Sequence, residues 1–265
     1  MATGSEIRTY FNGAWHDGNV PIMRAADHGA WLGTTVFDGA RYFQGVAPDL
    51  EAHCARANRS AKALMLNPGV ATDRMVDIVR EGLKRYPRDA AVYIRPMYWA
   101  IDGGQAAVAP GPAEAGFAVC LERIPMPPAD AATTLATTRF RRPVMDDAVV
   151  DAKAGCLYPN NARMLLEAAA KGYQNALAAD ALGNVAEAAT ANIFVVRDGE
   201  VLTPIANGTF LAGITRARHI ANLRAEGIPV SETVLSFDDV RAADEVFLSG
   251  NMSKVMPVTE FEGTH

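Results

Sequence analysis

The stretch Val149-Val150-Asp151-Ala152-Lys153-Ala154-Gly155-Cys156-Leu157-Tyr158 places one of only five lysines in this 265-residue chain among apolar and small residues. Folding should strip water from an ammonium group in such surroundings, which disfavours its charged form and leaves an amine able to attack a carbonyl. Lys153 is therefore predicted to be a Schiff-base lysine. The stretch alone leaves one alternative open, a strand residue whose stem is buried and whose ammonium reaches water.

Length and composition indicate a globular protein. A chain of 265 residues allows one large domain or two smaller ones, and 49% apolar residues are enough to build their cores. The formal net charge is −5, and no run of basic residues breaks the mixture of acids and bases. A nucleic-acid partner is not expected, because such a surface needs clustered cations to neutralise phosphates.

The sequence predicts neither a targeting segment nor a site built on cysteine. The first six residues lack the charged and apolar regions of a signal peptide, and no apolar run reaches the ~18 residues of a membrane span. A cytoplasmic protein is expected. Cys54, Cys120 and Cys156 are odd in number and show no CxxC spacing, so neither a metal site nor a disulfide framework is predicted. Cys156 is expected to be a small packing residue, since free cysteine is usually buried.

Turn residues and apolar spacing divide the first half of the chain into short elements. The Asn12-Gly13 pair between residues 8–11 and 14–16 predicts a hairpin. Residues 50–66 and 73–86 have helical patterns, and Thr72 is expected to cap the second helix. Strands are predicted over residues 90–100 and 116–121.

Three prolines between Arg123 and Asp130 predict a linker between two domains. The predicted organisation is a small N-terminal domain over residues 1–122, a linker over 123–131 and a C-terminal cofactor-binding domain over 132–265. In the second domain, helices are expected over 161–171 and 215–226, and strands over 175–179, 193–196 and 200–203. Separate strands and helices of this kind predict an α+β fold rather than a regular alternation of strand and helix.

A Schiff-base lysine needs an aldehyde partner, and pyridoxal phosphate also requires a phosphate site and an acid at its ring nitrogen. Leu211-Ala212-Gly213-Ile214-Thr215-Arg216 leads into a helix, whose first amides favour a phosphate. The simpler interpretation is an ordinary threonine cap. Glu187 is the lone carboxylate of an alanine-rich strand, where burial would demand a partner. Its simpler interpretation is a strand residue that faces solvent.

In this order and spacing the motifs resemble the fold type IV (class IV) pyridoxal-phosphate aminotransferases, and among them the branched-chain amino acid aminotransferases. The resemblance spans nearly the whole chain. It rests on residues 33–41 (Gly-Thr-Thr-Val-Phe-Asp-Gly-Ala-Arg), Ser60-Ala61-Lys62, Tyr93-Ile94-Arg95-Pro96, the Lys153 stretch, residues 187–194, Gly213-Ile214-Thr215-Arg216, and residues 243–247 followed by Ser249-Gly250.

The resemblance assigns a role to each candidate residue. Lys153 is expected to form the Schiff base with pyridoxal 5'-phosphate and to move the substrate proton, while Glu187 pairs with the ring nitrogen. The remaining cofactor contacts are expected from Arg56, Tyr158, Ile214, Thr215 and Asn251. Arg56 is expected to act as a forked donor to the phosphate, and Tyr158 to bond the phenolic oxygen. The substrate pocket is expected to contain Phe37, Gly39, Tyr93, Arg95 and Met252, with Gly39 leaving room for a substrate side chain.

Several positions depart from the family pattern. Asn251-Met252 follows Ser249-Gly250 where the branched-chain enzymes usually have Thr-Ala, which leaves the preferred donor open. Residues 188–191 replace a glycine-rich turn. Relatives usually continue with a last strand and helix beyond the position of His265, so either the C-terminus is truncated or that cap is absent.

The resemblance implies a transaminase that exchanges an amino group between branched-chain L-amino acids and 2-oxoglutarate by a ping-pong mechanism. Arg95 suits the second carboxylate. A D-amino acid or (R)-amine transaminase shares the fold, but the Arg-x-His pair of the D-specific relatives is missing from residues 97–102. An aminodeoxychorismate-type lyase and a cofactor-holding protein without catalysis are further alternatives. A homodimer is expected, because relatives complete each site near the equivalent of Trp31-Leu32. No membrane partner is expected.

Overall fold

The computed structural model describes residues 4–264, which pack into two units. The first runs as far as Met126 and also contains Ala152–Cys156, and the second contains Pro127–Asp151 and the chain from Leu157 onward. The chain therefore passes from one unit to the other inside the predicted linker. Ala152–Cys156 differs from the predicted boundaries, because it packs with the first unit and not with the rest of residues 132–265. The first three residues, on which the expected lack of a targeting segment partly rests, lie outside the described part.

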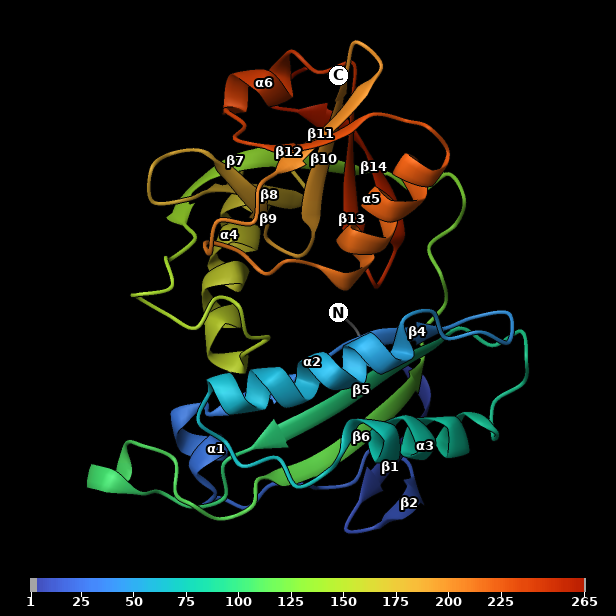
Figure 1. The fold of residues 1–265 in the computed structure, drawn as a ribbon, viewed down its shortest axis with the longest axis vertical. Helices are drawn as coiled ribbons and strands as arrows, with labels where there is room; N and C mark the ends of the chain where they lie inside the picture. The colour runs from blue at the N-terminus through green and yellow to red at the C-terminus, as the bar shows by residue number, and fades with distance from the viewer. Residues whose placement is uncertain (1–3, 265) are drawn as a thin grey trace. The chain divides into compact units, whose positions relative to one another are not determined.

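The first unit is a mixed layer of sheet and helix. Its six-stranded antiparallel sheet has the order β2-β1-β6-β5-β3, with β4 also paired to β5. The strands are β1 (Ser5–Phe11), β2 (Ala14–Asp17), β3 (Thr35–Phe37), β4 (Ala40–Tyr42), β5 (Val92–Trp99) and β6 (Gly116–Arg123). Helices α2 (Leu50–Ala63) and α3 (Thr72–Leu83) lie side by side over one face of this sheet, and the short α1 (His28–Leu32) lies near β5 (Figure 1).

Alternation along the strands decides which face the helices cover. In β5 the side chains of Val92, Ile94 and Tyr98 are fully buried, and Leu121 of β6 approaches Gly82 of α3. The residues between them, Tyr93, Arg95 and Met97, point to the opposite face because strand side chains alternate. The sheet thus has one apolar face under α2 and α3, and a second face that carries polar groups.

The second unit is an eight-stranded mixed sheet with the order β12-β11-β10-β13-β14-β7-β8-β9. Its strands are β7 (Thr133–Arg141), β8 (Asn175–Ala179), β9 (Val185–Ala188), β10 (Asn192–Arg197), β11 (Glu200–Pro204), β12 (Val230–Thr233), β13 (Glu245–Gly250) and β14 (Lys254–Phe261). Its helices are α4 (Tyr158–Ala170), α5 (Ile214–Ala225) and α6 (Phe237–Arg241). The remaining short helices of the described residues are two 3-10 turns, η1 (Gln105–Ala107) and η2 (Gly155–Leu157).

Two apolar layers sandwich this sheet. One face contributes Leu177 and Ile193 to a large core that also contains Val240 of α6. The other face packs Ala176 and Ala178 against α4, and Phe194 against α5. Helices α4 and α5 therefore cover the same face, and Glu187 and Asn192 also lie on it.

Most predicted elements are confirmed, and so is the α+β class. Asn12 and Gly13 both have positive φ, as a two-residue hairpin turn with right-handed strand twist requires. The predicted cap at Thr72 is wrong: Thr72 is the first helical residue after Ala71, and its hydroxyl accepts a hydrogen bond from Asn58. Helix α4 begins three residues before its predicted start, because Pro159 suits the first turn of a helix.

Candidate active site

Lys153 lies in an extended segment that is fastened on both sides. Its backbone N–H donates to Ser60 Oγ on α2 at 3.0 Å. Its carbonyl accepts from the Phe37 N–H at 3.1 Å, and the adjacent Ala154 forms an isolated bridge with Val36. Lys153 itself lies outside the strands, next to this bridge to β3. The Ser60 hydroxyl thus helps to position Lys153. In the sequence, Ser60 was singled out only as part of the Ser60-Ala61-Lys62 motif of the resembled family.

The Lys153 amine reaches the polar face of the first sheet. Lys153 Nζ lies 4.9 Å from the centre of the Phe37 ring. Phe37 is the direct cross-strand partner of Met97, so its side chain points to the same face as those of Tyr93 and Arg95. The sequence-predicted residues Phe37, Tyr93, Arg95 and Lys153 are thus brought together on one face.

This face carries more guanidinium than carboxylate. Arg95 Nη1 lies 2.5 Å from Glu122 Oε1. Arg41 is fully buried opposite Tyr93, and one of its nitrogens donates to the carbonyl of Pro125 at 3.1 Å. Among the described residues, Arg41 Nε and Nη1 have no hydrogen-bond partner, and burial lowers the pKa of this guanidinium. Two guanidinium groups against one carboxylate make the face suited to an anionic ligand.

Position 39 must be glycine to leave room for the Tyr93 side chain. A Cβ added at Gly39 would collide with the Tyr93 hydroxyl. The Tyr93 hydroxyl lies beside Gly39, and the expected role of Gly39 in leaving room for a substrate side chain stays a prediction. Arg95 in turn lies over the Tyr93 ring, with 5.1 Å from its guanidinium carbon to the ring centre.

Arg56 is buried and forms a cluster with Asp38 and His53. Its Nε and Nη2 donate to the two Asp38 oxygens at 2.6 and 2.9 Å, and His53 Nδ1 lies 2.7 Å from Asp38 Oδ1. Burial alone would raise the pKa of Asp38, but Arg56 and His53 outweigh that effect and lower it to about 2. Arg56 Nε and one Nη2 hydrogen hold Asp38, so a forked donation to a phosphate would use Nη1 with the second hydrogen of Nη2, and it stays a prediction. Of the three Arg56 nitrogens, the buried Nη1 is the one without a hydrogen-bond partner among the described residues.

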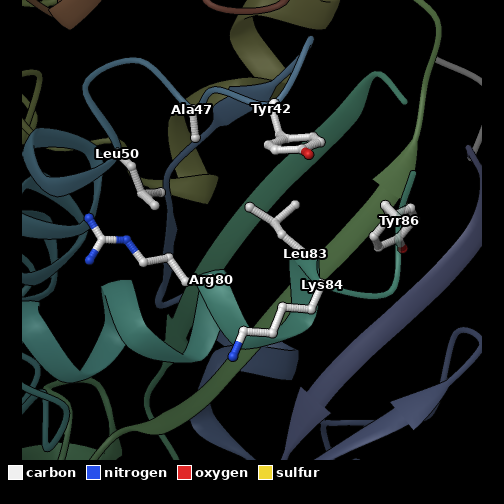
Figure 2. A pocket seen from close by; sticks show the side chains of 8 residues that line it. Tyr42, Ala47, Leu50, Arg80, Leu83, Lys84 and Tyr86 are labelled. Atoms are coloured by element: carbon white, nitrogen blue, oxygen red, sulfur yellow. The ribbon is translucent and has the colours of Figure 1, made fainter. Parts of the chain in front are cut away.

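A hollow of about 350 Å³ elsewhere in the first unit does not contain these groups. Its walls come from α2, α3 and the connection between β4 and α2 (Figure 2). The lining residues are Tyr42, Gly45, Ala47, Leu50, Arg80, Leu83, Lys84 and Tyr86. None of the sequence-predicted site residues is among them.

In the second unit Glu187 is buried and paired. Its side chain is on β9, and Arg142 Nε lies 3.1 Å from Glu187 Oε1, close enough for an ion pair although not aligned as a hydrogen bond. Arg142 also donates to Asn161 Oδ1 on α4 at 2.8 Å. The alternative of a solvent-facing strand residue is therefore wrong for Glu187, which is 8% exposed. Burial of a carboxylate in this way requires the cation that the structure supplies.

Asn192 connects Glu187 with the start of α5, a link that the sequence reasoning missed. Its Nδ2 donates to Glu187 Oε2 at 3.2 Å and to the carbonyl of Leu211 at 3.1 Å. A Cβ added at Gly213 would collide with Asn192 Oδ1. Glycine at position 213 therefore lets the backbone before α5 pass close over Asn192. The only signal in the sequence was an amide side chain five residues after Glu187, followed by four apolar residues.

Helix α5 begins at Ile214, and its N-cap residue Gly213 provides no side-chain cap. The first amides of a helix have no partner within it, so those of Ile214 and Thr215 are suited to an anion. Thr215 is buried. The ordinary threonine cap is therefore wrong here, because Thr215 lies inside the first turn and not at the cap position.

The turn between β13 and β14 contains Asn251 and Met252. Lys254, which has a positive φ, donates from Nζ to Asn251 Oδ1 at 2.5 Å. Just before the turn, Ser249 Oγ lies 2.9 Å from His219 Nδ1 of α5. Burial, followed by the charge of Lys254, lowers the pKa of His219. Tyr158 is the first residue of α4 and is 37% exposed.

Other sequence expectations are tested only within residues 4–264. No group of histidine, cysteine and acidic residues there could hold a metal ion. No helix of this range is both long and apolar enough to cross a bilayer. Cys156 is exposed rather than buried, so its expected packing role is wrong.

Comparison with known proteins decides the family. The profile described as amino-transferase class IV matches residues 35–261. The chain belongs to the class IV aminotransferases. It is 32% identical over 97% of its length to a putative branched-chain-amino-acid aminotransferase of Methanocaldococcus jannaschii, covering 88% of that relative. It is 31% identical over 99% of its length to the branched-chain-amino-acid aminotransferase of Escherichia coli K12, covering 87% of that protein.

A solved structure supports the same assignment. An aminotransferase from Brucella abortus, bound to its cofactor PLP, is 55% identical and matches with a TM-score of 0.95 over 97% of this chain and 91% of that one. The family uses pyridoxal phosphate, and the chain is accordingly a pyridoxal-phosphate-dependent aminotransferase.

The side chains present fit that cofactor. In the first unit, Lys153 supplies the amine and the buried Arg56 Nη1 is a donor without a partner among the described residues. In the second unit, Glu187 is a buried carboxylate and α5 begins without a side-chain cap. An amine, an acid and anion donors are the groups that this cofactor requires.

Proposed function

We propose that this class IV aminotransferase moves the amino group between branched-chain L-amino acids and 2-oxoglutarate by a ping-pong mechanism. The observation that carries the proposal is the shared sheet face of Lys153, Phe37, Tyr93 and Arg95. It offers an amine, an apolar ring and a guanidinium together, which suits an amino acid donor and a dicarboxylate acceptor in turn. The name of the Escherichia coli relative, at 31% identity, supports the choice of branched-chain donors.

Six residues are proposed to hold the cofactor besides Lys153. Glu187 would keep a proton on the ring nitrogen, and Arg142 and Asn192 hold Glu187 for that role. Arg56 Nη1 and the amides of Ile214 and Thr215 would bind the phosphate. Tyr158 would bond the phenolic oxygen, and Asn251 is the remaining proposed contact, through its backbone or its Lys254-held side chain. Pyridoxal phosphate held there would supply an aldehyde and a ring that withdraws electrons from the substrate.

The chain's own contribution to the reaction is a proton transfer and an orientation. Lys153 Nζ would take the proton from the substrate Cα and pass it to the cofactor. Its neighbours suit that task, because the Phe37 ring at 4.9 Å restricts water around the amine. The backbone bonds of Lys153 to Ser60 and Phe37 fix the origin of its side chain.

Substrate recognition is proposed to use Phe37 and Met252 for the apolar side chain of the substrate, with Gly39 beside the Tyr93 hydroxyl. Arg95 is proposed to meet the second carboxylate of 2-oxoglutarate. A homodimer is proposed as the smallest assembly, and the exposure of Trp31 (58%) and Leu32 (39%) in the first unit supports a covering partner there. Light scattering would give the mass. A cytoplasmic location is also proposed.

The direct test is the absorbance spectrum of the cofactor-loaded protein before and after L-leucine, with D-alanine and (R)-1-phenylethylamine in parallel. Conversion to the pyridoxamine form with L-leucine, and reversal by 2-oxoglutarate, are expected. Conversion only by the D- or (R)-donors would contradict the proposed stereochemistry. Pyruvate release from aminodeoxychorismate without an acceptor would instead identify a lyase.

A further inference from the structure

Arg95 already has a carboxylate partner in its own unit. Glu122 Oε1 lies 2.5 Å from Arg95 Nη1. The Glu122 side chain is only 4% exposed, whereas that of Arg95 is 28% exposed. The buried carboxylate is therefore the fixed member of the pair, and the guanidinium is the member that a solute can reach.

Glu122 is held in place from more than one side. Its Oε2 accepts from the backbone N–H of Gly4 at 2.9 Å, and the Cys120 thiol lies 3.6 Å from Oε1. Burial would raise the pKa of Glu122, but the Gly4 amide and Arg95 outweigh that effect and lower it. The carboxylate thus stays ionised at neutral pH.

The pair belongs to the face that carries Lys153. Tyr93 is the cross-strand partner of Glu122, and Arg95 is the partner of Cys120. Directly opposite residues of an antiparallel pair point to the same side. Met97, two residues from Arg95 and so ~7 Å along β5, is paired with Phe37, over which Lys153 Nζ lies.

We propose that Glu122 is a specificity-determining residue that acts through Arg95 and selects against substrates with a second carboxylate. The inference rests on the proposed function, in which Arg95 meets such a carboxylate. A substrate with an apolar side chain leaves the Arg95–Glu122 pair intact. A dicarboxylate must share the guanidinium with Glu122, and two carboxylates at one site repel each other.

Glu122 therefore sets the balance between the two half-reactions. The branched-chain donor finds a neutralised Arg95, which avoids leaving an unpaired charge beside an apolar side chain. The acceptor 2-oxoglutarate and its product glutamate bind against the repulsion of Glu122. Their use is limited by this residue and not by the strength of Arg95 alone.

The test is Glu122→Gln, assayed separately with L-leucine and L-glutamate as donors to the cofactor-loaded enzyme. Because a charge-assisted bond contributes ~1.5 to 3 kcal/mol, the ratio of kcat/KM for glutamate over leucine should rise on the order of 10- to 100-fold. The change should lie mainly in the KM for glutamate. Glu6→Gln is the matched control, because Glu6 forms an exposed pair with Arg123 in the same unit, and its ratio should not change.

Two further variants keep the outcome interpretable. Glu122→Asp keeps the charge but draws it back from Arg95, so a smaller rise in the same direction is expected even if Glu122→Gln folds poorly. In an Arg95→Gln background, Glu122→Gln should no longer raise the ratio. A ratio that is unchanged or lower in folded Glu122→Gln would overturn the inference while leucine turnover persists. Absence of turnover with leucine in the unaltered enzyme would instead overturn the proposed function.

Discussion

Arg95 of the first unit stays within reach of solvent, whereas Glu187 and Asn192 of the second unit are buried in its sheet. Arg95 keeps 28% of its side chain exposed on the face that carries Lys153, while Glu187 and Asn192 are 8% and 5% exposed. An exposed group can change partners during turnover, but a buried one must be satisfied permanently. Arg95 therefore suits the changing substrate of the proposed function, and Glu187 and Asn192 suit one lasting ligand.

The same contrast exists inside the first unit. The Asp38–Arg56 pair is almost completely buried, with side-chain exposures of 0% and 9%, whereas the Arg95–Glu122 pair is open on its guanidinium side. Arg56 uses two nitrogens to hold Asp38, and its Nη1 has no hydrogen-bond partner among the described residues. A deeply buried pair of this kind fixes geometry, and an open pair can take part in selection.

The largest expected effect comes from Lys153→Ala, which removes the amine from the polar face of the first sheet. Turnover with L-leucine should fall by at least about 10⁴-fold, because both the nucleophile and the proton carrier are lost. Borohydride reduction followed by mass spectrometry should find a covalent cofactor adduct on the unaltered chain and none on the variant. Lys62→Ala, at an exposed position of α2, is the control and should keep both adduct and activity. Full activity in folded Lys153→Ala would remove this residue from the reaction.

Asp38→Asn tests the buried pair of the first unit. It leaves Arg56 as an uncompensated buried charge, so the free energy of unfolding at pH 7 should fall by about 3 to 5 kcal/mol. The pKa of Asp38 is lowered in the folded protein from 3.8 to about 2. Its stabilising contribution is therefore complete above pH ~4 and is lost as the pH falls toward ~2.

Urea unfolding at pH 7 and at pH 3 checks both parts of this prediction. About 1 kcal/mol of the difference between the two proteins should disappear between pH 7 and pH 3, because Asp38 of the unfolded chain is mostly protonated at pH 3 while Asp38 of the folded chain, with a pKa of about 2, is still mostly ionised. Asp73→Asn, at an exposed position of α3, should change stability by less than about 0.5 kcal/mol. A difference that does not depend on pH would show that the charge of Asp38 is not the cause.

The sequence predicts groups better than it predicts their partners. Lys153 is visible because lysine is rare in this chain, and Glu187 because it is alone in an apolar strand. The hairpin of β1 and β2 follows from Asn12-Gly13, and Asp198-Gly199 is the same kind of turn between β10 and β11; all four residues have positive φ. These signals are local, so they can be read before the chain is folded.

The partners depend on strand register and on contacts between distant segments. Glu122 is opposite Tyr93 only because β5 and β6 pair in one register, and nothing in the local sequence of either strand marks that pairing. Arg142 reaches Glu187 across 45 positions in the sequence, and Lys153 is held by Ser60 across 93. The contacts of Arg56 with Asp38 and of Gly39 with Tyr93 could not be predicted for the same reason, because each joins two separate elements.

Glu187→Gln tests the buried group of the second unit and should have the smallest of the three effects. The variant should still bind the cofactor through its other contacts, because glutamine keeps an acceptor for Asn192. Turnover should fall by about 10² to 10³-fold, since a neutral amide cannot stabilise positive charge on the ring nitrogen. The turnover of Glu187→Asp should lie between those of Glu187→Gln and the unaltered enzyme. Glu167→Gln, which alters a carboxylate of α4 that pairs with Lys171, is the control for folding of the unit. If Glu187→Gln turned over leucine at nearly the normal rate, the buried carboxylate would serve only to balance Arg142, and the distinction drawn between the two units would no longer hold.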